Sequence, residues 1–454
     1  MKLTPEKIYE NYNNRVLDKV SAVENLISII ENSDNINSRI EGIETLKKID
    51  ITDNKACFKL LENLLISDTF EKIRNTAAKV IKQKFLDKAL EPMKWALQHE
   101  ESPLCLNTIY NTIIEVISKL EREKEPSAKS LLLDEVKKMN ERDFKISFEI
   151  LCEIKPINDF TKLELASILI NYFTLVFLKK TYWRLKYKIE KCKIIELNFI
   201  FKGLTSLPEA IKNLSSLKTL IFRYNQILSI PDWIGSLSSL ESLNLNVNNI
   251  ISLPESIGSL SSLKELSLWK NELNSLPKSI GSLSSLEILN LRLNQLETIP
   301  DVIGNITSLK ELNLHDNKLS KLPYSIGSLS SLEKLNLSWN ELKSIPESIG
   351  SLLSLKELDL GRNELDTIPH SISSLTSLKE LNLSENKLTT IPQTIGNLSS
   401  LQILNLSRNE LIKLPETLNK LTSLKELYVG DNRLINKYSK AIKNLERMGV
   451  QVYY

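Results

Sequence analysis

The spacing of apolar residues divides the chain into two parts. Up to about residue 180 they recur at three- and four-residue steps, as in the run from Val23 to Ile30, which places them on one face of a helix. Polar breaks interrupt this pattern about every 33 to 35 residues, near 32–35, 67–68 and 99–103. The pattern predicts an all-α first domain over residues 1–190, either an α-solenoid of helix pairs or an irregular helical domain.

The second part, residues 191–454, repeats every 23 residues. Ten of the 15 prolines and most of the glycines keep this step, with Ser373 in one glycine slot. The asparagines keep it at Asn225, Asn248, Asn271, Asn294, Asn317, Asn340, Asn363, Asn386, Asn409 and Asn432. A period between about 20 and 50 residues indicates stacked supersecondary units.

One unit, residues 309–329, indicates how each repeat folds. Residues 312–314 alternate in polarity, as a half-buried strand does. Asn317 follows where the chain must turn, and its side chain can bond backbone groups of the turn. Pro323 fits the start of a short helix or 3₁₀ turn, and Gly327 is expected to allow a tight turn. Stacked units would form one parallel sheet on the concave side of a solenoid, with the asparagines in a buried ladder.

The repeated motif, LxxLxLxxNxLxx(I/L)PxxIGxL, resembles the 23-residue leucine-rich repeat of intracellular Ras-suppressor-type and plant Ras-group proteins. Ten units match at the asparagine, and an eleventh, degenerate unit begins near Ile194 with Lys202 in the asparagine slot. The resemblance implies protein binding through the concave sheet, often in signalling around small GTPases. The first domain resembles HEAT-like helical pairs.

Two segments are expected to close the ends of the solenoid. Residues 435–445 read as an amphipathic helix, Gly449 as its C-cap and residues 450–454 as a closing strand, which together form a polar cap from about residue 435. Residues 165–178 form an uncharged run of 14 residues, shorter than the ~20 that a membrane span needs. This run predicts a buried helix that caps the first repeat, with membrane contact as the alternative.

The amino-acid composition excludes several classes of protein but does not indicate a function. With 42% hydrophobic and 25% charged residues, the chain is neither disordered, nor collagen-like, nor a multi-span membrane protein. The net charge of +3 is too balanced to indicate a polyanionic partner. The four cysteines form no CxxC pair, and no apolar signal segment follows Met1, so we expect a cytoplasmic protein.

No sequence motif points to catalysis. The chain lacks a GxxxxGK(S/T) phosphate loop, a GxSxG elbow, an HExxH motif and a kinase signature. His315 and Asp316 are neighbours, but no nucleophile is placed near them by sequence. We therefore expect no enzyme activity, no catalytic residues, no cofactor and no metal site.

The concave face is the expected binding surface. In the motif LxxLxLxxN, the third, fifth and seventh positions point away from the leucine core. The seventh position changes from bulky residues in the early repeats to serine and glycine in the late ones. Tryptophan, tyrosine and arginine dominate binding hot spots. The predicted partner site comprises Arg223, Tyr224, Asn246, Trp269, Arg292, His315 and Trp339.

A basic stretch between the two parts offers an alternative site. Its cations are Lys179, Lys180, Arg184, Lys186 and Lys188, with aromatic residues between them. Such a stretch can contact nucleic acid or an anionic membrane surface. It also fits a solvated face of a junction helix whose aromatic residues pack on the first repeat.

These observations converge on a monomeric, non-enzymatic scaffold whose partner is a protein rather than nucleic acid or a membrane. Only the family resemblance suggests a small GTPase as the partner. The alternatives are a nucleic-acid or membrane-surface adaptor and a substrate-recruiting subunit of an enzyme complex.

Overall fold

A computed structural model of the chain describes residues 3–434 and 440–454. The chain separates into two compact units. The helical unit comprises residues 1–185 and 189–193, and the repeat unit comprises residues 186–188 and 194–454.

The helical unit is built from α-helices that begin and end near the predicted polar breaks. Side chains of Thr4, Asp18, Asn35 and Asn54 accept hydrogen bonds from first-turn backbone N–H groups and so begin four of these helices. The helices are α1 (Pro5–Asn13), α2 (Lys19–Asn32), α3 (Ile36–Lys48), α4 (Lys55–Ser67), α5 (Glu71–Lys84), α6 (Leu90–His99), α7 (Pro103–Arg122), α8 (Pro126–Lys137), α9 (Arg142–Ile154) and α10 (Lys162–Thr181). Short 3₁₀ turns lie at Leu86–Lys88 and Ile157–Asp159.

The helices stack in two rows. In one row α3 packs against α5, α5 against α7 and α7 against α10, while α4 contacts α2 and α6 in the other. Arg39 of α3 pairs with Asp68 at 2.5 Å, and Arg74 of α5 pairs with Glu100 at 2.7 Å. Burial opposes ionisation of Glu100, but hydrogen bonds from Arg74 and Ser102 N–H outweigh it and lower its pKa to about 2. This arrangement favours stacked helix pairs, and HEAT identity stays a hypothesis.

Helix α10 contains the apolar run 165–178 and is buried, as predicted. It packs against α7 and α8, and the hydroxyl groups of Tyr110 and Thr174 lie 2.9 Å apart between α7 and α10. Among the described helices, none combines the length and apolarity needed to cross a bilayer. Its capping of the first repeat stays a prediction.

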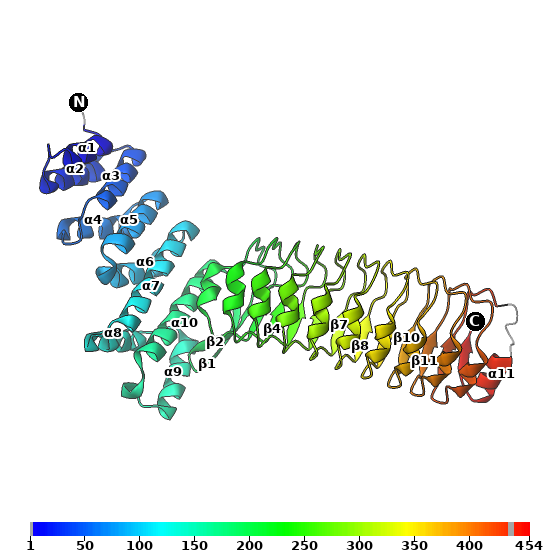
Figure 1. Ribbon diagram of the computed structural model, residues 1–454. Coiled ribbons are helices and arrows are strands. Elements are labelled where there is room, and N and C mark those ends of the chain that lie inside the picture. The colour runs from blue at the N-terminus through cyan, green and yellow to red at the C-terminus, as the bar shows by residue number, and fades with distance from the viewer. Residues whose placement is uncertain (1–2, 435–439) are drawn as a thin grey trace. The chain divides into compact units, whose positions relative to one another are not determined.

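The repeat unit carries one ladder of short strands, and the strands from residue 193 onward pair in parallel, as predicted (Figure 1). Neighbouring strands pair one full repeat apart, so that Leu312 faces Leu335 and Asn313 faces Asn336. The strands are β1 (Lys186–Glu190), β2 (Lys193–Asn198), β3 (Thr219–Ile221), β4 (Ser242–Asn244), β5 (Glu265–Ser267), β6 (Ile288–Asn290), β7 (Glu311–Asn313), β8 (Lys334–Asn336), β9 (Glu357–Asp359), β10 (Glu380–Asn382), β11 (Ile403–Asn405), β12 (Glu426–Tyr428) and β13 (Gln451–Tyr453).

A five-residue 3₁₀ helix lies between successive strands from β2 to β12. A proline in extended conformation precedes each one, as Pro323 does at φ −68°. The helices are η3 (Glu209–Asn213), η4 (Asp232–Ser236), η5 (Glu255–Ser259), η6 (Lys278–Ser282), η7 (Asp301–Asn305), η8 (Tyr324–Ser328), η9 (Glu347–Ser351), η10 (His370–Ser374), η11 (Gln393–Asn397) and η12 (Glu416–Lys420). Leucines and isoleucines from both sides meet between them, and Leu312, Leu314 and Ile326 are at most 1% exposed.

The asparagine ladder exists as predicted and joins each repeat to the one before it. Asn317 Nδ2 donates to the carbonyl oxygens of Leu291 (3.0 Å) and Leu314 (3.1 Å), and its Oδ1 accepts from Leu296 N–H (3.1 Å). The same three bonds recur around Asn340. Each side chain therefore satisfies backbone groups that the turn leaves unpaired in the core.

The repeated glycines have a different role from the predicted one. No described glycine of the 3₁₀ helices, Gly327 included, has positive φ, so none is needed for a tight turn. A Cβ on Gly281 would lie 2.5 Å from the Val302 carbonyl oxygen in the next 3₁₀ helix. Glycine at this position instead permits the close approach of neighbouring repeats.

The C-terminal cap agrees with prediction where the structure describes it. Helix α11 spans Lys440–Arg447, and β13 pairs in parallel with β12. Gly449 has φ +90°, the conformation expected of a glycine C-cap. Residues 435–439, where the helix was predicted to begin, lie outside the described residues.

Replacing a ladder asparagine should destabilise the repeat unit. Asn317→Ala removes all three bonds at a site only 7% exposed, and each buried group left unpaired costs about 1–3 kcal/mol. We expect a clear fall in the thermal unfolding midpoint, followed by circular dichroism. The matched control is Asn274→Ala, since Asn274 is exposed, and equal midpoints for both variants would contradict the ladder's role.

Adding one methyl group at a repeat glycine should also destabilise the stack. Gly281→Ala pushes a Cβ into the Val302 carbonyl, and overpacking of this kind costs about 1–3 kcal/mol. Urea unfolding checks the expected shift of the midpoint to lower urea concentration. Ser373→Ala occupies the equivalent slot without adding a clash and should unfold like the parent chain; an unchanged Gly281→Ala midpoint would contradict the close-approach argument.

Candidate functional site

After each strand comes one buried apolar residue, and after it come two residues that precede the ladder asparagine. We call the positions of these two residues the rim. In the unit around β7 the rim residues are His315 and Asp316, directly before Asn317. The second rim residue has positive φ in every unit, although none is glycine. These residues are Phe201, Tyr224, Val247, Lys270, Leu293, Asp316, Trp339, Arg362, Glu385, Arg408 and Asp431, with φ between 51° and 59°. Since the conformation is common to all units, it belongs to the repeat and marks no single site.

Three predicted residues form one cluster on the early rim. The guanidinium carbon of Arg223 lies 4.8 Å from the ring centroid of Tyr224 and 5.5 Å from that of Trp269. Phe201 extends the cluster, because its ring stacks on Tyr224 at 4.5 Å and 8°. The sequence reasoning missed Phe201, although Lys202 in the asparagine slot places it in register with Tyr224. The cluster is an exposed aromatic surface around one cation.

Asn246 supports this cluster and does not line it. The residue is 8% exposed, and its Oδ1 accepts from Ser267 Oγ and Trp269 N–H, both at 2.8 Å. Contrary to expectation, the Asn246 side chain does not point to solvent, because a seventh-position side chain can fold back onto the next unit.

Two other predicted residues form a second cluster. His315 and Trp339 meet edge to face with ring centroids 6.2 Å apart, and Arg362 lies 3.9 Å above the Trp339 ring. His315 Nδ1 also lies 2.8 Å from Ser338 Oγ. Trp339 remains 47% exposed. Arg292 is exposed between the two clusters, so the structure divides the predicted site in two.

The environment of His315 disfavours its charged form. Burial is the largest cause of its lowered pKa, and the positive charge of Arg292 is the next; Asp316 and Asp359 act in the opposite direction. His315 is therefore neutral at physiological pH, and the field of Arg292 extends along the rim to the next unit.

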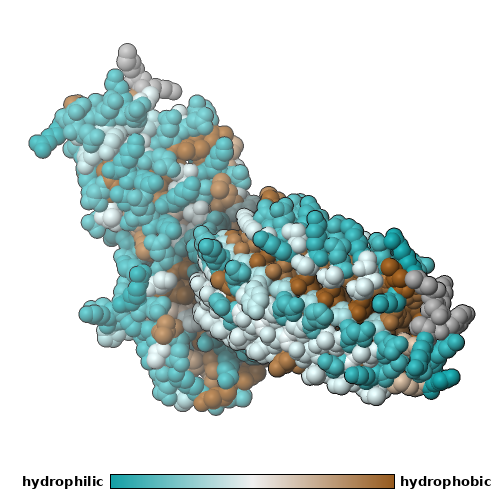
Figure 2. All heavy atoms as spheres, turned by 45° about the vertical axis from the view of Figure 1, so that its right-hand side comes forward, coloured by the Kyte–Doolittle hydropathy of each residue, from teal (hydrophilic) through white to brown (hydrophobic). Residues whose placement is uncertain are grey.

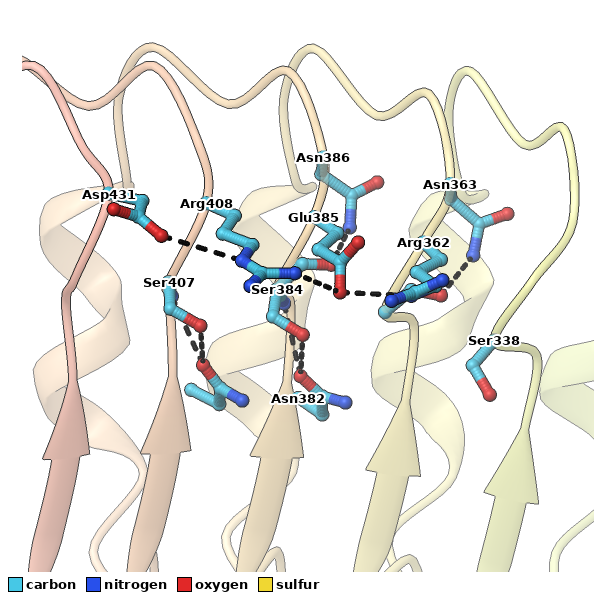
Figure 3. Close-up of polar contacts among 12 residues, drawn as sticks. Ser338, Arg362, Asn363, Asn382, Ser384, Glu385, Asn386, Ser407, Arg408 and Asp431 are labelled. Atoms are coloured by element: carbon cyan, nitrogen blue, oxygen red, sulfur yellow. Dashed lines mark hydrogen bonds and ion pairs between the residues drawn. The ribbon is translucent and has the colours of Figure 1, made fainter.

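The late rim neutralises its own charges (Figure 3). Arg362 Nε lies 2.9 Å from Glu385 Oε1, which also pairs with Arg408 at 3.3 Å, and Arg408 pairs with Asp431 at 3.4 Å. Small residues such as Ser384 and Ser407 stand beside this chain of charges (Figure 3) and bond the asparagines below them.

The strand surface beside the rim is acidic. A hollow of about 390 Å³ over β7–β10 contains Glu311, Glu357, Asp359 and Glu380 around Lys334. Lys334 pairs with Glu357 at 3.0 Å. On the face visible in Figure 2, hydrophobic residues of the repeat unit form narrow rows between hydrophilic and neutral ones.

The basic stretch does not form a helix throughout, contrary to one interpretation of its sequence. Lys179 and Lys180 end α10, where Lys179 pairs with Glu141 at 2.7 Å and Lys180 Nζ donates to the carbonyl oxygens of Leu97 and Gln98. Lys186 and Lys188 lie on β1. A two-residue turn with positive φ follows at 191–192.

Arg184 precedes β1, and its guanidinium carbon lies 4.1 Å from the Trp183 ring, which is 73% exposed. The predicted patch is therefore divided between a helix end and a strand.

The described residues hold no group of three or more histidine, cysteine or acidic side chains suited to a metal ion. All four cysteines are free thiols. Burial raises the pKa of Cys57 and of Cys192 to about 11, so these thiols stay protonated near neutral pH.

Removing the charge of Arg292 should raise the pKa of His315. Arg292→Gln deletes the second-largest cause of the lowered value, so protonation becomes easier. The check is an NMR titration of the three histidines, assigned with His315→Gln. Arg408→Gln, far along the same rim, should leave the pKa unchanged; a pKa that stays constant or falls in Arg292→Gln would contradict this electrostatic coupling.

Comparison with known proteins identifies the repeats. A family model described as leucine-rich repeat region matches residues 232–318, 302–387 and 370–452. A second, described as leucine rich repeat, matches residues 201–250. Together they cover more than half of the chain. No curated protein matched the sequence.

Several solved structures are similar. A leucine-rich repeat protein of Leptospira interrogans is 29% identical over 56% of this chain and 82% of its own, with a TM-score of 0.35. The functional domain of InlJ from Listeria monocytogenes is 23% identical over 57% of this chain and 53% of its own, with a TM-score of 0.49. The ectodomain of the Arabidopsis receptor kinase HAESA is 33% identical over 54% of this chain and 43% of its own, with a TM-score of 0.48.

Proposed function

Because the chain belongs to the leucine-rich repeat proteins and carries a helical region before its repeats, we propose that it is a non-enzymatic scaffold. It binds a protein partner along the rim and the strand surface of the repeat unit. Proteins with such repeats typically mediate protein–protein interactions.

The observation that carries the proposal is the pair of aromatic clusters on the rim. The fold does not require them, because Gly361 stands at the position of Trp269 in another unit and Glu385 at the position of Tyr224 and Trp339. Trp269 and Tyr224 are partly exposed and Trp339 is exposed, and each has an arginine against its ring. Tryptophan, tyrosine and arginine are the residues most enriched in binding hot spots.

The rigidity of the repeat unit supports the same function. Each rim residue lies between a paired strand and a ladder asparagine, so its backbone is fixed before a partner arrives. Little conformational entropy is then lost at the interface, and more of the contact energy appears as affinity.

The finer parts of the proposal are a partner from small-GTPase signalling, a cytoplasmic location, a monomeric state and no cofactor. Only the first of these follows from the family resemblance, and the others rest on the sequence. A substrate-recruiting role within an enzyme complex would use the same surface. An adaptor for nucleic acid or membranes is less well supported, because Lys179 and Lys180 already bind groups of the helical unit.

The proposal predicts that the partner is lost when the early rim is truncated. The partner is first captured from the native cell with the full chain and identified by mass spectrometry. Its affinity is then measured with the Trp269→Ser, Arg292→Ser double variant. Hot-spot truncation costs about 2 kcal/mol or more, so we expect an affinity at least about 30-fold lower.

The matched control is Tyr324→Ser, which removes a 73% exposed aromatic residue from the first position of η8 and away from the rim. It should bind like the parent chain. If the folded double variant binds with unchanged affinity, the early rim is not the partner site.

A further inference from the structure

Several cations of the repeat unit pair with acids from the neighbouring unit. Lys264 pairs with Glu241 at 2.8 Å, Lys310 with Glu287 at 2.7 Å and Lys356 with Glu333 at 2.7 Å, each across one repeat. The late rim follows the same rule through Arg362, Glu385 and Arg408. On the rim, a cation of one unit can therefore be neutralised by an acid of the next.

The early rim lacks the ion pairs of the late rim. Its positions after β3 to β6 carry Arg223, Lys270 and Arg292 but no aspartate or glutamate. Within the described chain, none of these three cations has a carboxylate oxygen within 4.0 Å. We call Arg223, Tyr224, Trp269, Lys270 and Arg292 the cationic strip.

Arg223 is also held in place and incompletely bonded. The Tyr224 and Trp269 rings fix its guanidinium, and one Nη donates to the Tyr224 hydroxyl at 3.2 Å. Arg223 Nε and Trp269 Nε1 are buried and donate to no acceptor in the described chain. The Nη groups are therefore the part of this guanidinium that a carboxylate of a partner can bind.

We propose that the cationic strip binds an extended acidic segment of the protein partner. One carboxylate lies against Arg223, another against Arg292, and Lys270 stands between them. The strip spans three strand spacings, roughly 14 Å, so the two carboxylates are about four residues apart in an extended chain. This inference rests on the proposed function and adds the chemistry of the ligand.

Charge on the neighbouring strands favours a protein segment over nucleic acid. Glu265 lies on β5, the strand that precedes Trp269 and Lys270, and Glu311, Glu357 and Glu380 follow on β7, β9 and β10. A polyphosphate backbone requires a continuous basic surface, and these carboxylates would repel it. A short segment with two localised charges fits the strip without crossing the acidic strands.

The test uses the full chain and a fluorescein-labelled five-residue peptide with blocked ends, which has glutamate at its first and last positions and glutamine between them. We expect the peptide to bind in fluorescence anisotropy, the matching five-glutamine peptide not to bind, and an eight-residue oligothymidylate to bind more weakly than the glutamate peptide. Affinity should fall as salt rises from 50 to 500 mM, because charge pairs at an exposed rim are screened.

Charge-removing variants then locate the binding. Arg223→Gln and Arg292→Gln should each weaken glutamate-peptide binding about fivefold, as expected for the loss of one partly exposed charge pair. Arg408→Gln is the matched control, since it removes an arginine from the same rim that is already paired. It should leave the affinity unchanged.

Equal binding of the glutamine peptide, equal effects of Arg408→Gln and Arg223→Gln, or tighter binding of oligothymidylate would each overturn the inference. The last result would assign the strip to nucleic acid. A fourth outcome separates the inference from the proposed function. If the glutamate peptide fails to bind but the Trp269→Ser, Arg292→Ser double variant loses the captured protein, the inference of an acidic ligand is overturned and the proposed function stands.

Discussion

The buried asparagine side chains supply the interaction on which the repeat unit depends. A chain that turns back after a three-residue strand leaves backbone N–H and C=O groups unpaired in an apolar core, where unpaired polar groups are costly. Each asparagine binds two carbonyl oxygens and one N–H group, and two of these three belong to the preceding unit or its turn. The amide therefore closes its own turn and fixes the distance to its neighbour. Leucine burial supplies the driving force for stacking, but the amide ladder sets the register.

Because the register is fixed, the rim presents two side chains per unit at equivalent backbone positions. The backbone is the same in every unit, including the left-handed second rim residue, so differences between units lie almost entirely in side chains. Along the late rim these side chains satisfy one another through Glu385 and its two arginines. Along the early rim they leave aromatic faces and positive charge uncompensated. An asymmetric surface thus arises on a repetitive scaffold without any change in the fold.

Periodicity made most of the fold predictable. A 23-residue step in asparagine and proline predicted the parallel sheet, the ladder and the 3₁₀ helices, because each of these residues has one strong local reason for its position. The role of the repeated glycines was predicted wrongly. At Gly281 the missing side chain permits close contact with Val302 in the next unit and is not needed for the local backbone conformation. Asn246 was misplaced for a similar reason, since its burial depends on Ser267 and Trp269 one unit later.

The candidate site was predictable only in part. The sequence indicated which residues are unusual at the rim but not which of them touch. Contacts such as those of Phe201 with Tyr224, or of Arg362 with Trp339, depend on side-chain direction across units. The change from helix to strand between Lys180 and Lys186 was equally hidden, because a run of alternating basic and aromatic residues suits both structures.

The strict pairing of each strand one unit away from its neighbour has a genetic consequence. Adding or deleting a whole block of 23 codons would leave every remaining leucine opposite a leucine and every amide opposite its carbonyl. A block of any other length would misalign all of them at the junction. Whole repeats can therefore be added to or removed from this protein without breaking the register of the stack, and each such change brings different rim residues side by side.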